Sequence, residues 1–193
     1  MSALKILVIP GSLRSGSHNA KLAMAAAHEF ALAGADVTRI SLADFPLPIY
    51  DGDLQAKSGI PKNAVNLKRM IGSHHGVLMV TPEYNSSVPA LVKNTIDWVT
   101  RVKERNETLG QVFRERAFAL GAASDGKFGG LRVLMALRQI LTLGCGATVI
   151  PTQMGLSHAD KAFDDMGALK EERDANLLRA TVRQLIDVSQ RMM

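Results

Sequence analysis

Five strand-like segments alternate with helix-like segments along the whole chain. The strand-like segments cover residues 4–9, 36–41, 76–80, 116–123 and a short stretch near 146–150; the helix-like segments cover residues 19–34, 62–73, 88–103, 131–143 and about 167–191. Such alternation is typical of a parallel sheet with helices on both faces and right-handed crossovers. The sequence therefore predicts an α/β fold with a doubly wound, five-stranded parallel sheet in three layers.

The composition fits such a sheet. Hydrophobic residues make up 47% of the chain and aromatic residues only 5%, so the core must be largely aliphatic and alanine. Parallel strands buried on both faces are built from such residues. A chain of 193 residues can bury a core of this kind without disulfides or metals, and we expect one domain over residues 1–193.

Residues 43–61 interrupt the alternation. This segment contains Pro46, Pro48, Gly52, Gly59 and Pro61, which predicts a long loop. Structureless loops longer than about 12–15 residues are uncommon in compact domains and often carry function.

Three polar loops follow strand-like segments at their carboxyl ends, over residues 10–18, 81–87 and 124–130. In doubly wound sheets, ligands bind beyond the carboxyl ends of the strands, where the strand order reverses. We therefore expect the three loops to converge on one site.

The first loop has the chemistry of a phosphate site. It supplies the hydroxyls of Ser12, Ser15 and Ser17, the Arg14 guanidinium and the Asn19 amide, and it opens directly into a helix. Donors gathered at a positive helix terminus suit a phosphate monoester. The alternative is a polar turn without a ligand, in which a serine caps the helix.

Two other nucleotide-binding patterns are absent from this loop. A Walker A loop needs Lys after its second glycine, whereas Ser17 and His18 follow Gly16. A dinucleotide fingerprint needs G-x-G-x-x-G, whereas only Gly11 and Gly16 are present. Neither motif is met.

The second loop, T-P-E-Y-N-S-S at residues 81–87, follows the most apolar strand-like segment and combines an aromatic ring with an amide and hydroxyls. Such a loop suits a flat heteroaromatic ring, although it could also be a turn that caps the next helix. The third loop is rich in glycine, which permits close approach of the backbone to a ring edge.

Taken together, the motifs are similar to those of the NADPH-dependent FMN reductase family, which includes quinone, chromate and azo-dye reductases. The matching elements are G-S-L-R-x-G-S-x-N at 11–19, P-L-P-I-Y-D at 46–51, T-P-E-Y-N-x-S-V-P-x-x-x-K-N at 81–94, I-D-W at 96–98 and G-G-x-R at 129–132. The resemblance covers roughly residues 4–155 and implies a flavodoxin-like sheet with strand order 2-1-3-4-5.

The resemblance also implies roles for individual residues. It assigns Ser12, Arg14, Ser17 and Asn19 to the FMN phosphate, Pro82, Glu83, Tyr84 and Asn85 to the isoalloxazine ring, and Ser124 and Gly126 to the flavin edge. His18 is a further candidate for cofactor binding, with a surface or helix-capping role as its alternative.

The implied activity is that of an FMN-dependent NAD(P)H oxidoreductase acting on quinones, flavins, azo compounds or metal oxyanions such as chromate. The cofactor carries the chemistry, so no side chain is expected to act as a catalytic acid, base or nucleophile. The resemblance further implies a homodimer or homotetramer with the flavin site at the interface. Tyr50-Asp51 and the segment near Arg101 are candidates for that interface, or else exposed loop and helix end.

Two other functions remain open: a flavodoxin-type electron carrier without its own NAD(P)H site, and a flavin-free binding module on the same scaffold. Such carriers tend to be acidic, whereas this chain has a net charge of +5 and a pI near 9.6. Its Lys and Arg residues are spread along the chain and mixed with acids, so we expect a solvated surface rather than a nucleic-acid partner.

The remaining features indicate a cytoplasmic protein without a metal or a membrane partner. The first residues lack the shape of a signal peptide, and no apolar run approaches the roughly 20 residues that cross a bilayer. The single cysteine, Cys145, is expected to be a buried small hydrophobe. His74-His75 and the acidic segment 158–165 lack the spacing of metal ligands.

Overall fold

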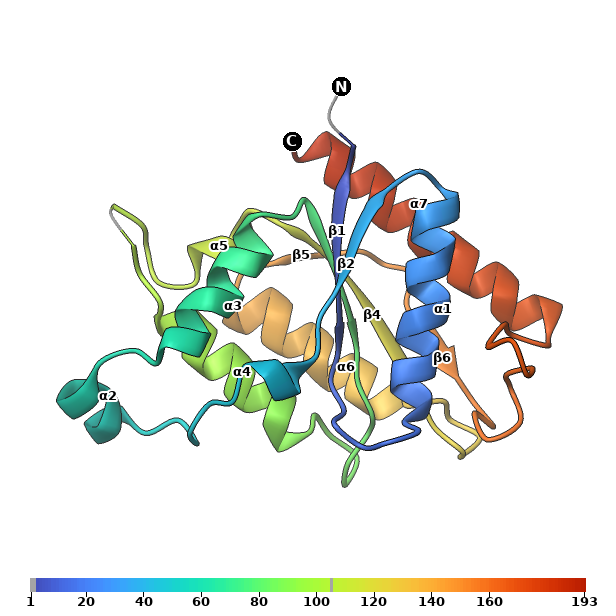
Figure 1. The fold of residues 1–193 in the computed structure, drawn as a ribbon, viewed down its shortest axis with the longest axis horizontal. Helices are drawn as coiled ribbons and strands as arrows, with labels where there is room; N and C mark the ends of the chain where they lie inside the picture. The colour runs from blue at the N-terminus through green and yellow to red at the C-terminus, as the bar shows by residue number, and fades with distance from the viewer. Residues whose placement is uncertain (1–2, 105) are drawn as a thin grey trace.

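The computed structural model describes residues 3–104 and 106–193, and it confirms the α/β fold (Figure 1). The strands are β1 (Lys5–Pro10), β2 (Asp36–Arg39), β3 (Gly76–Val80), β4 (Ala117–Ala123), β5 (Thr148–Val149) and β6 (Met154–Leu156). The α-helices are α1 (His18–Leu32), α2 (Gly52–Ser58), α3 (Lys62–Gly72), α4 (Ala90–Arg101), α5 (Gln111–Arg114), α6 (Leu131–Gln139) and α7 (Glu172–Arg191). A 3-10 turn, η1 (Leu42–Asp44), and a π-helical turn, η2 (Ile140–Gly144), complete the described elements.

The sheet has the predicted flavodoxin-like order β2-β1-β3-β4-β5, and all its paired strands are parallel. Every residue of β3 and β4 is buried, as expected for central strands covered on both faces, whereas β2 at the edge is partly exposed. A sixth short strand, β6, was not predicted. It pairs with residues 121–123 of β4, beyond the point where β5 pairs with residues 117–118.

β5 and β6 therefore share one edge position of the sheet. The chain between them contains Pro151, which has no N–H to donate to a strand ladder, so the edge strand is broken there. An interrupted strand gives two very short apolar segments, and the second one is too short to detect by its pattern.

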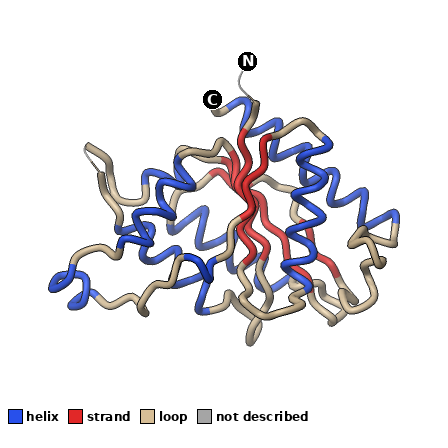
Figure 2. The backbone as a smooth tube through the Cα atoms, viewed as in Figure 1, coloured by secondary structure: helices blue, strands red, loops and turns tan. Residues whose placement is uncertain are grey.

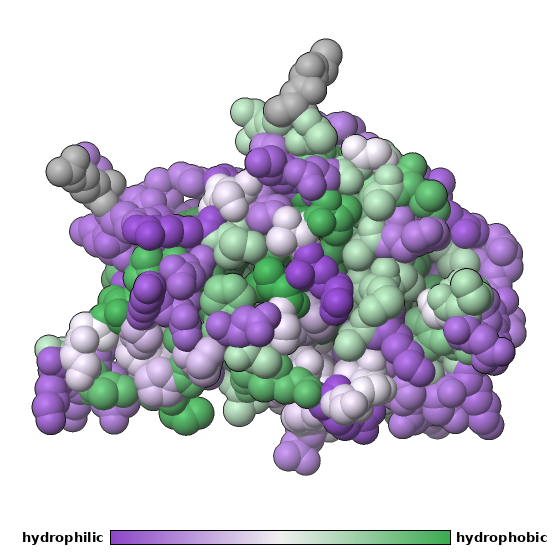
Figure 3. Space-filling view, viewed as in Figure 1, coloured by the Kyte–Doolittle hydropathy of each residue, from purple (hydrophilic) through white to green (hydrophobic). Residues whose placement is uncertain are grey.

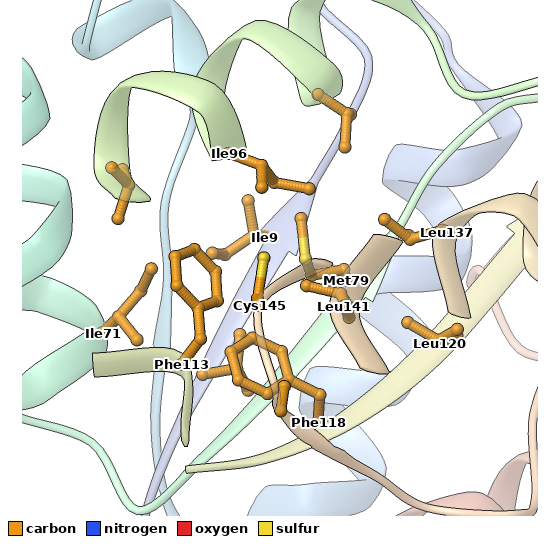
Figure 4. Close-up of a cluster of buried hydrophobic side chains, with 14 of the residues drawn as sticks. Ile9, Ile71, Met79, Ile96, Phe113, Phe118, Leu120, Leu137, Leu141 and Cys145 are labelled. Carbon is orange, nitrogen blue, oxygen red and sulfur yellow. The ribbon is translucent and has the colours of Figure 1, made fainter. Parts of the chain in front are cut away.

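Alternate residues of each central strand pack into opposite layers. Leu7, Ile9, Val77 and Met79 face a core formed with α3, α4, α5 and α6, part of which is drawn in Figure 4. Ile6, Val8, Leu78 and Val80 face the other core, formed with α1 and α7. The two helical layers lie on either side of the sheet in Figure 1, giving the three-layer arrangement.

The segment 43–61 differs from the predicted loop, because it contains α2. The Asp51 carboxylate caps this helix by accepting hydrogen bonds from the N–H groups of Asp53 and Leu54, at 2.7 and 3.1 Å. Gly59 ends the helix with a positive φ of 75°. The cap and the final glycine are recognisable helix signals, but the prolines on both sides concealed them.

Two further boundaries differ from the prediction by more than two residues. The helix expected over 131–143 is regular only to Gln139 and continues as the π-helical turn η2. The C-terminal helix begins at Glu172 rather than near 167, because Phe163 and Leu169 form a small antiparallel bridge that holds the preceding segment out of the helix. Among the described residues, no helix has the length and apolar character needed to cross a membrane.

The three polar loops all lie at one edge of the sheet, at the bottom of Figure 1 and in tan at the bottom of Figure 2. The start of β1 and the end of α7 lie near the opposite edge. The predicted convergence of loops 10–18, 81–87 and 124–130 at the carboxyl ends of the strands is therefore observed.

Candidate functional site

A small pocket of about 110 Å³ opens between the three loops. Its lining contains nine predicted site residues: Ser12, Arg14, Ser17, His18, Asn19, Pro82, Glu83, Tyr84 and Ser124. Ala123 and Asp125 complete the lining. The two other predicted residues, Asn85 and Gly126, belong to the same loops but not to the pocket wall.

Backbone hydrogen bonds fix where each loop leaves the sheet. The Gly11 N–H donates to the Val80 carbonyl at 2.7 Å, and the Thr81 N–H donates to the Gly121 carbonyl at 2.9 Å. The first loop also lies very close to α4: a Cβ added to Gly11 would stand 2.5 Å from a methyl group of Val92. Only glycine fits there, so Gly11 allows the first loop to pack directly against α4.

The first loop presents unused donors. Ser17 caps α1 by accepting a hydrogen bond from the Ala20 N–H at 3.4 Å, whereas the N–H groups of His18 and Asn19 have no acceptor among residues 3–104 and 106–193. The exposed Arg14 guanidinium makes no ion pair or side-chain hydrogen bond with any described residue. Free N–H groups at a helix N-terminus beside an unpaired guanidinium fit a phosphate group.

Asn19 joins the first loop to the third. Its side chain is buried, accepts a hydrogen bond from the Ala123 N–H at 2.8 Å and donates one to the Ala123 carbonyl at 2.9 Å. Ala123 is the last residue of β4 and is followed at once by the third loop. The Asn19 side chain thus fixes the distance between two walls of the pocket, a role that the sequence pattern did not reveal.

The second loop is a tight hairpin that projects from the lower edge, where Figure 3 shows a hydrophilic tip. Tyr84 and Ser87 exchange backbone hydrogen bonds of 3.1 and 3.0 Å around a two-residue turn. The turn residues Asn85 and Ser86 both have positive φ, 49° and 63°. Asparagine tolerates this conformation well, so Asn85 shapes the turn that presents the half-exposed Tyr84 ring.

The Glu83 carboxylate ties the second loop to α6. It accepts hydrogen bonds from the N–H groups of Arg132 and Val133 at 3.0 and 3.1 Å, and it binds the Arg132 guanidinium at 2.5 to 2.7 Å. A carboxylate at a helix N-terminus is stabilised by the helix dipole. Because this carboxylate is only 9% exposed and fully engaged, it holds the loops in place and is not available for proton transfer.

His18 and Asp125 close the pocket between the first and third loops. Their side chains form an ion pair or a hydrogen bond, depending on the charge of the imidazole, with Nε2 and Oδ1 3.0 Å apart. The Ser124 hydroxyl accepts a hydrogen bond from the Gly126 N–H at 3.2 Å, which folds the third loop back at this point. Gly126 therefore supports the loop from outside the pocket.

Cys145 lies away from this site, in the core between the sheet and α4 and α6 (Figure 4). Burial raises the pKa of its thiol to about 11, so the thiol is protonated and uncharged at neutral pH. Cys145 therefore packs as a small hydrophobic residue. His74 is also buried, with Nδ1 2.6 Å from the Met70 carbonyl. No group of three or more potential metal ligands occurs in the part of the chain that the structure describes.

Comparison with known proteins identifies the family of this chain. Residues 4–161 match the model of the NADPH-dependent FMN reductase family. The chain is 33% identical over 183 residues to an NAD(P)H-dependent FMN reductase of Pseudomonas aeruginosa, covering 94% of this chain and 93% of that protein. It is 38% identical over 139 residues to a quinone reductase of Escherichia coli K12, covering 72% of this chain and 69% of the relative.

A solved structure agrees with these relatives. The flavoenzyme NAD(P)H:(acceptor) oxidoreductase FerB of Paracoccus denitrificans has a TM-score of 0.77 at 28% identity, and the match covers 98% of this chain and 99% of FerB. The three converging loops, their donors for a phosphate and this set of relatives lead to one conclusion: the chain belongs to the NADPH-dependent FMN reductase family, a family of FMN-binding, NAD(P)H-dependent oxidoreductases.

Proposed function

We propose that this protein reduces quinones with electrons from NAD(P)H by way of FMN bound between its three loops, as one FMN-binding unit over residues 1–193. The observation that carries the proposal is the set of unused donors in the first loop, directly beside the aromatic hairpin of the second loop. Bound FMN would supply the hydride and electron transfer chemistry between NAD(P)H and the acceptor.

The first loop holds the phosphate in this proposal. Arg14 supplies the charge, the His18 and Asn19 N–H groups supply hydrogen bonds along the α1 axis, and the Ser12 and Ser17 hydroxyls complete the set. Asn19 acts through its backbone, because its side chain is engaged with Ala123. A buried amide is needed at position 19 because the side chain binds the backbone of Ala123 while the backbone N–H remains available to the phosphate.

The second and third loops border the ring. Pro82 and Tyr84 offer a flat apolar surface to the ring, while Asn85 and Gly126 maintain the turns. Glu83 holds the second and third loops in fixed positions, because its carboxylate binds the first N–H groups of α6. The side chains around the pocket therefore bind and orient, and none of them has to exchange a proton with the substrate.

Quinones are the acceptor class that the named relatives favour, since one of them is a quinone reductase. Free flavins, azo compounds and metal oxyanions such as chromate are further candidates, because a flavin can pass electrons to many small acceptors. We place the protein in the cytoplasm, where NADPH and NADH are available and a single protonated thiol is stable.

The protein is proposed to act as a homodimer or homotetramer with the flavin at the interface. Residues 46–51 and α2 project from the sheet as an arm held by α4: the Asn94 amide bonds Tyr50 N–H and the Pro48 carbonyl, and the Trp98 indole donates to Pro48 at 2.7 Å. Arg101 stacks over the Tyr50 ring at 5.1 Å. An ordered arm without buried residues in its helix suits contact with a second copy.

Absorbance spectroscopy tests the reductase proposal. Purified protein mixed with FMN and separated from free flavin is expected to show the absorbance of bound oxidised flavin, and anaerobic NADPH or NADH is expected to bleach it. A following addition of a benzoquinone should restore the absorbance. Absence of bound flavin would refute the proposal, and bound flavin that neither nucleotide bleaches would identify an electron carrier instead.

Replacing Asp125 with asparagine is expected to strengthen FMN binding by roughly threefold. The Asp125 carboxylate lines the pocket assigned to the phosphate, whose charge at pH 7 is about −1.5 to −2, so the two anions repel. The effect is modest because the side chain is 63% exposed and water screens it. FMN fluorescence quenching measures the affinity.

Riboflavin, which lacks the phosphate, is the matched ligand for this variant. Its affinity should be the same for the wild type and for Asp125→Asn, and the gain for FMN should shrink as salt is added. Weaker FMN binding in the variant would mean that Asp125 supports the cradle through His18 rather than opposing the phosphate.

A further inference from the structure

Lys127, Phe128 and Arg132 form an exposed cluster, here called the rim cluster, beside the pocket. The Phe128 side chain is 57% exposed. The Lys127 Nζ lies 5.1 Å from the centroid of its ring, and the Arg132 Cζ lies 5.6 Å from it. An exposed aromatic ring flanked by two cations contributes little to the core and is available to a ligand.

The rim cluster is attached directly to the pocket. Asp125, two residues before Lys127, lines the pocket, and so does Glu83, which binds the Arg132 guanidinium. The loop between Phe128 and α6 is also tightly fixed: Gly130 has φ of 76°, and a Cβ there would stand 2.5 Å from the Cβ of Ala122. The backbone that carries Phe128 into α6 is therefore held at a defined place on the rim.

The charge of the rim cluster is uneven. The Arg132 guanidinium is balanced by the Glu83 carboxylate, whereas Lys127 has no carboxylate partner among the described residues. One spare cation beside a flat apolar surface has the chemistry that recognises a purine carrying a phosphate group: the base stacks on the ring, and the ammonium pairs with the phosphate.

We propose that the rim cluster binds the adenosine end of the dinucleotide and selects NADPH over NADH. Phe128 stacks on the adenine, and Lys127 contacts the 2′-phosphate that only NADPH carries. Arg132, held by Glu83, orients the Phe128 ring. This inference rests on the proposed NAD(P)H-dependent reduction, and it adds the preference for one nucleotide and the residues that set it.

Binding of 2′,5′-ADP and 5′-ADP to the FMN-loaded protein, measured by isothermal titration calorimetry, tests the inference without turnover. Lys127→Gln should weaken 2′,5′-ADP binding about tenfold and leave 5′-ADP binding unchanged, because only the first ligand carries the 2′-phosphate. Phe128→Leu keeps an apolar side chain but loses the aromatic face, so both ligands should bind several-fold more weakly.

Lys103→Gln is the matched control. Lys103 is also exposed, but it lies beyond the carboxyl end of α4, away from the loops, so its removal should affect neither ligand. Equal weakening of 2′,5′-ADP by Lys103→Gln and Lys127→Gln would indicate a general charge effect and would overturn the proposal, as would unchanged binding in Lys127→Gln.

Steady-state kinetics separates this inference from the proposed function. With a quinone as acceptor, Lys127→Gln should raise the KM for NADPH about tenfold, with kcat and the KM for NADH unchanged. If wild-type protein is bleached by both nucleotides but Lys127→Gln changes neither KM, only the rim-cluster inference fails. If neither nucleotide bleaches the wild type, the proposed reductase activity fails as well.

Discussion

Replacing Asn19 with alanine is expected to lower the free energy of unfolding by roughly 2–4 kcal/mol. The substitution leaves the Ala123 N–H and carbonyl without their partner in a buried position, and each unsatisfied group costs about 1–3 kcal/mol. The same variant should weaken FMN binding, because the end of β4 and the third loop are no longer fixed to α1. Urea unfolding with and without FMN measures both effects.

Asn94→Ala is a matched control for this prediction. The Asn94 side chain makes the same pair of backbone bonds, at 2.8 and 2.9 Å, but to the arm at residues 48 and 50 near the surface, where water replaces lost partners. Its expected cost is about 1 kcal/mol or less, since solvated groups are not left unsatisfied. A loss of stability in Asn19→Ala no larger than in Asn94→Ala would contradict the role given to Asn19.

The parallel sheet could be predicted from the sequence because its central strands are fully apolar and its helices are long. β3 and β4 are buried along their whole length, and short, fully apolar runs of this kind are typical of strands in the interior of a sheet. β6 and α5 could not be predicted, because segments of three and four residues give no periodicity to detect. α2 was missed since Pro46, Pro48 and Pro61 suggest a loop more strongly than Asp51 suggests a cap.

The site was predictable as a group of loops but not in the division of tasks among its residues. Strand ends fixed the location, and the motifs named residues that do line the pocket. A linear sequence does not show, however, that Glu83 turns toward α6 or that Asn19 turns toward Ala123, because these partners are 49 to 50 and 104 residues away along the chain. Polar residues in one motif therefore divide into those that face the pocket and those that brace it.

That division makes Arg14 the most informative residue of the first loop, since its guanidinium is unpaired among the described residues and faces the pocket. Arg14→Ala is expected to weaken FMN binding by roughly 1.5–3 kcal/mol, a factor of about 10 to 150, because a charge-assisted hydrogen bond to the phosphate is lost. Arg14→Lys should recover part of the loss, as it keeps the charge without the forked donor. FMN fluorescence quenching by the purified apoprotein gives the affinities.

Two comparisons make the Arg14 result specific. Riboflavin should bind wild type and Arg14→Ala equally, since it has no phosphate, and the unfolding free energy of the apoprotein should be unchanged, since the exposed side chain has no partner to lose. Arg39→Ala removes the same charge from the end of β2 without touching the pocket, so FMN affinity should stay near the wild-type value. If Arg39→Ala weakens FMN binding as much as Arg14→Ala does, FMN affinity depends on the overall positive charge of the protein and not on a specific contact with Arg14. Because the pocket also holds the Asp125 carboxylate, a localised cation at Arg14 offsets the repulsion between that carboxylate and the phosphate.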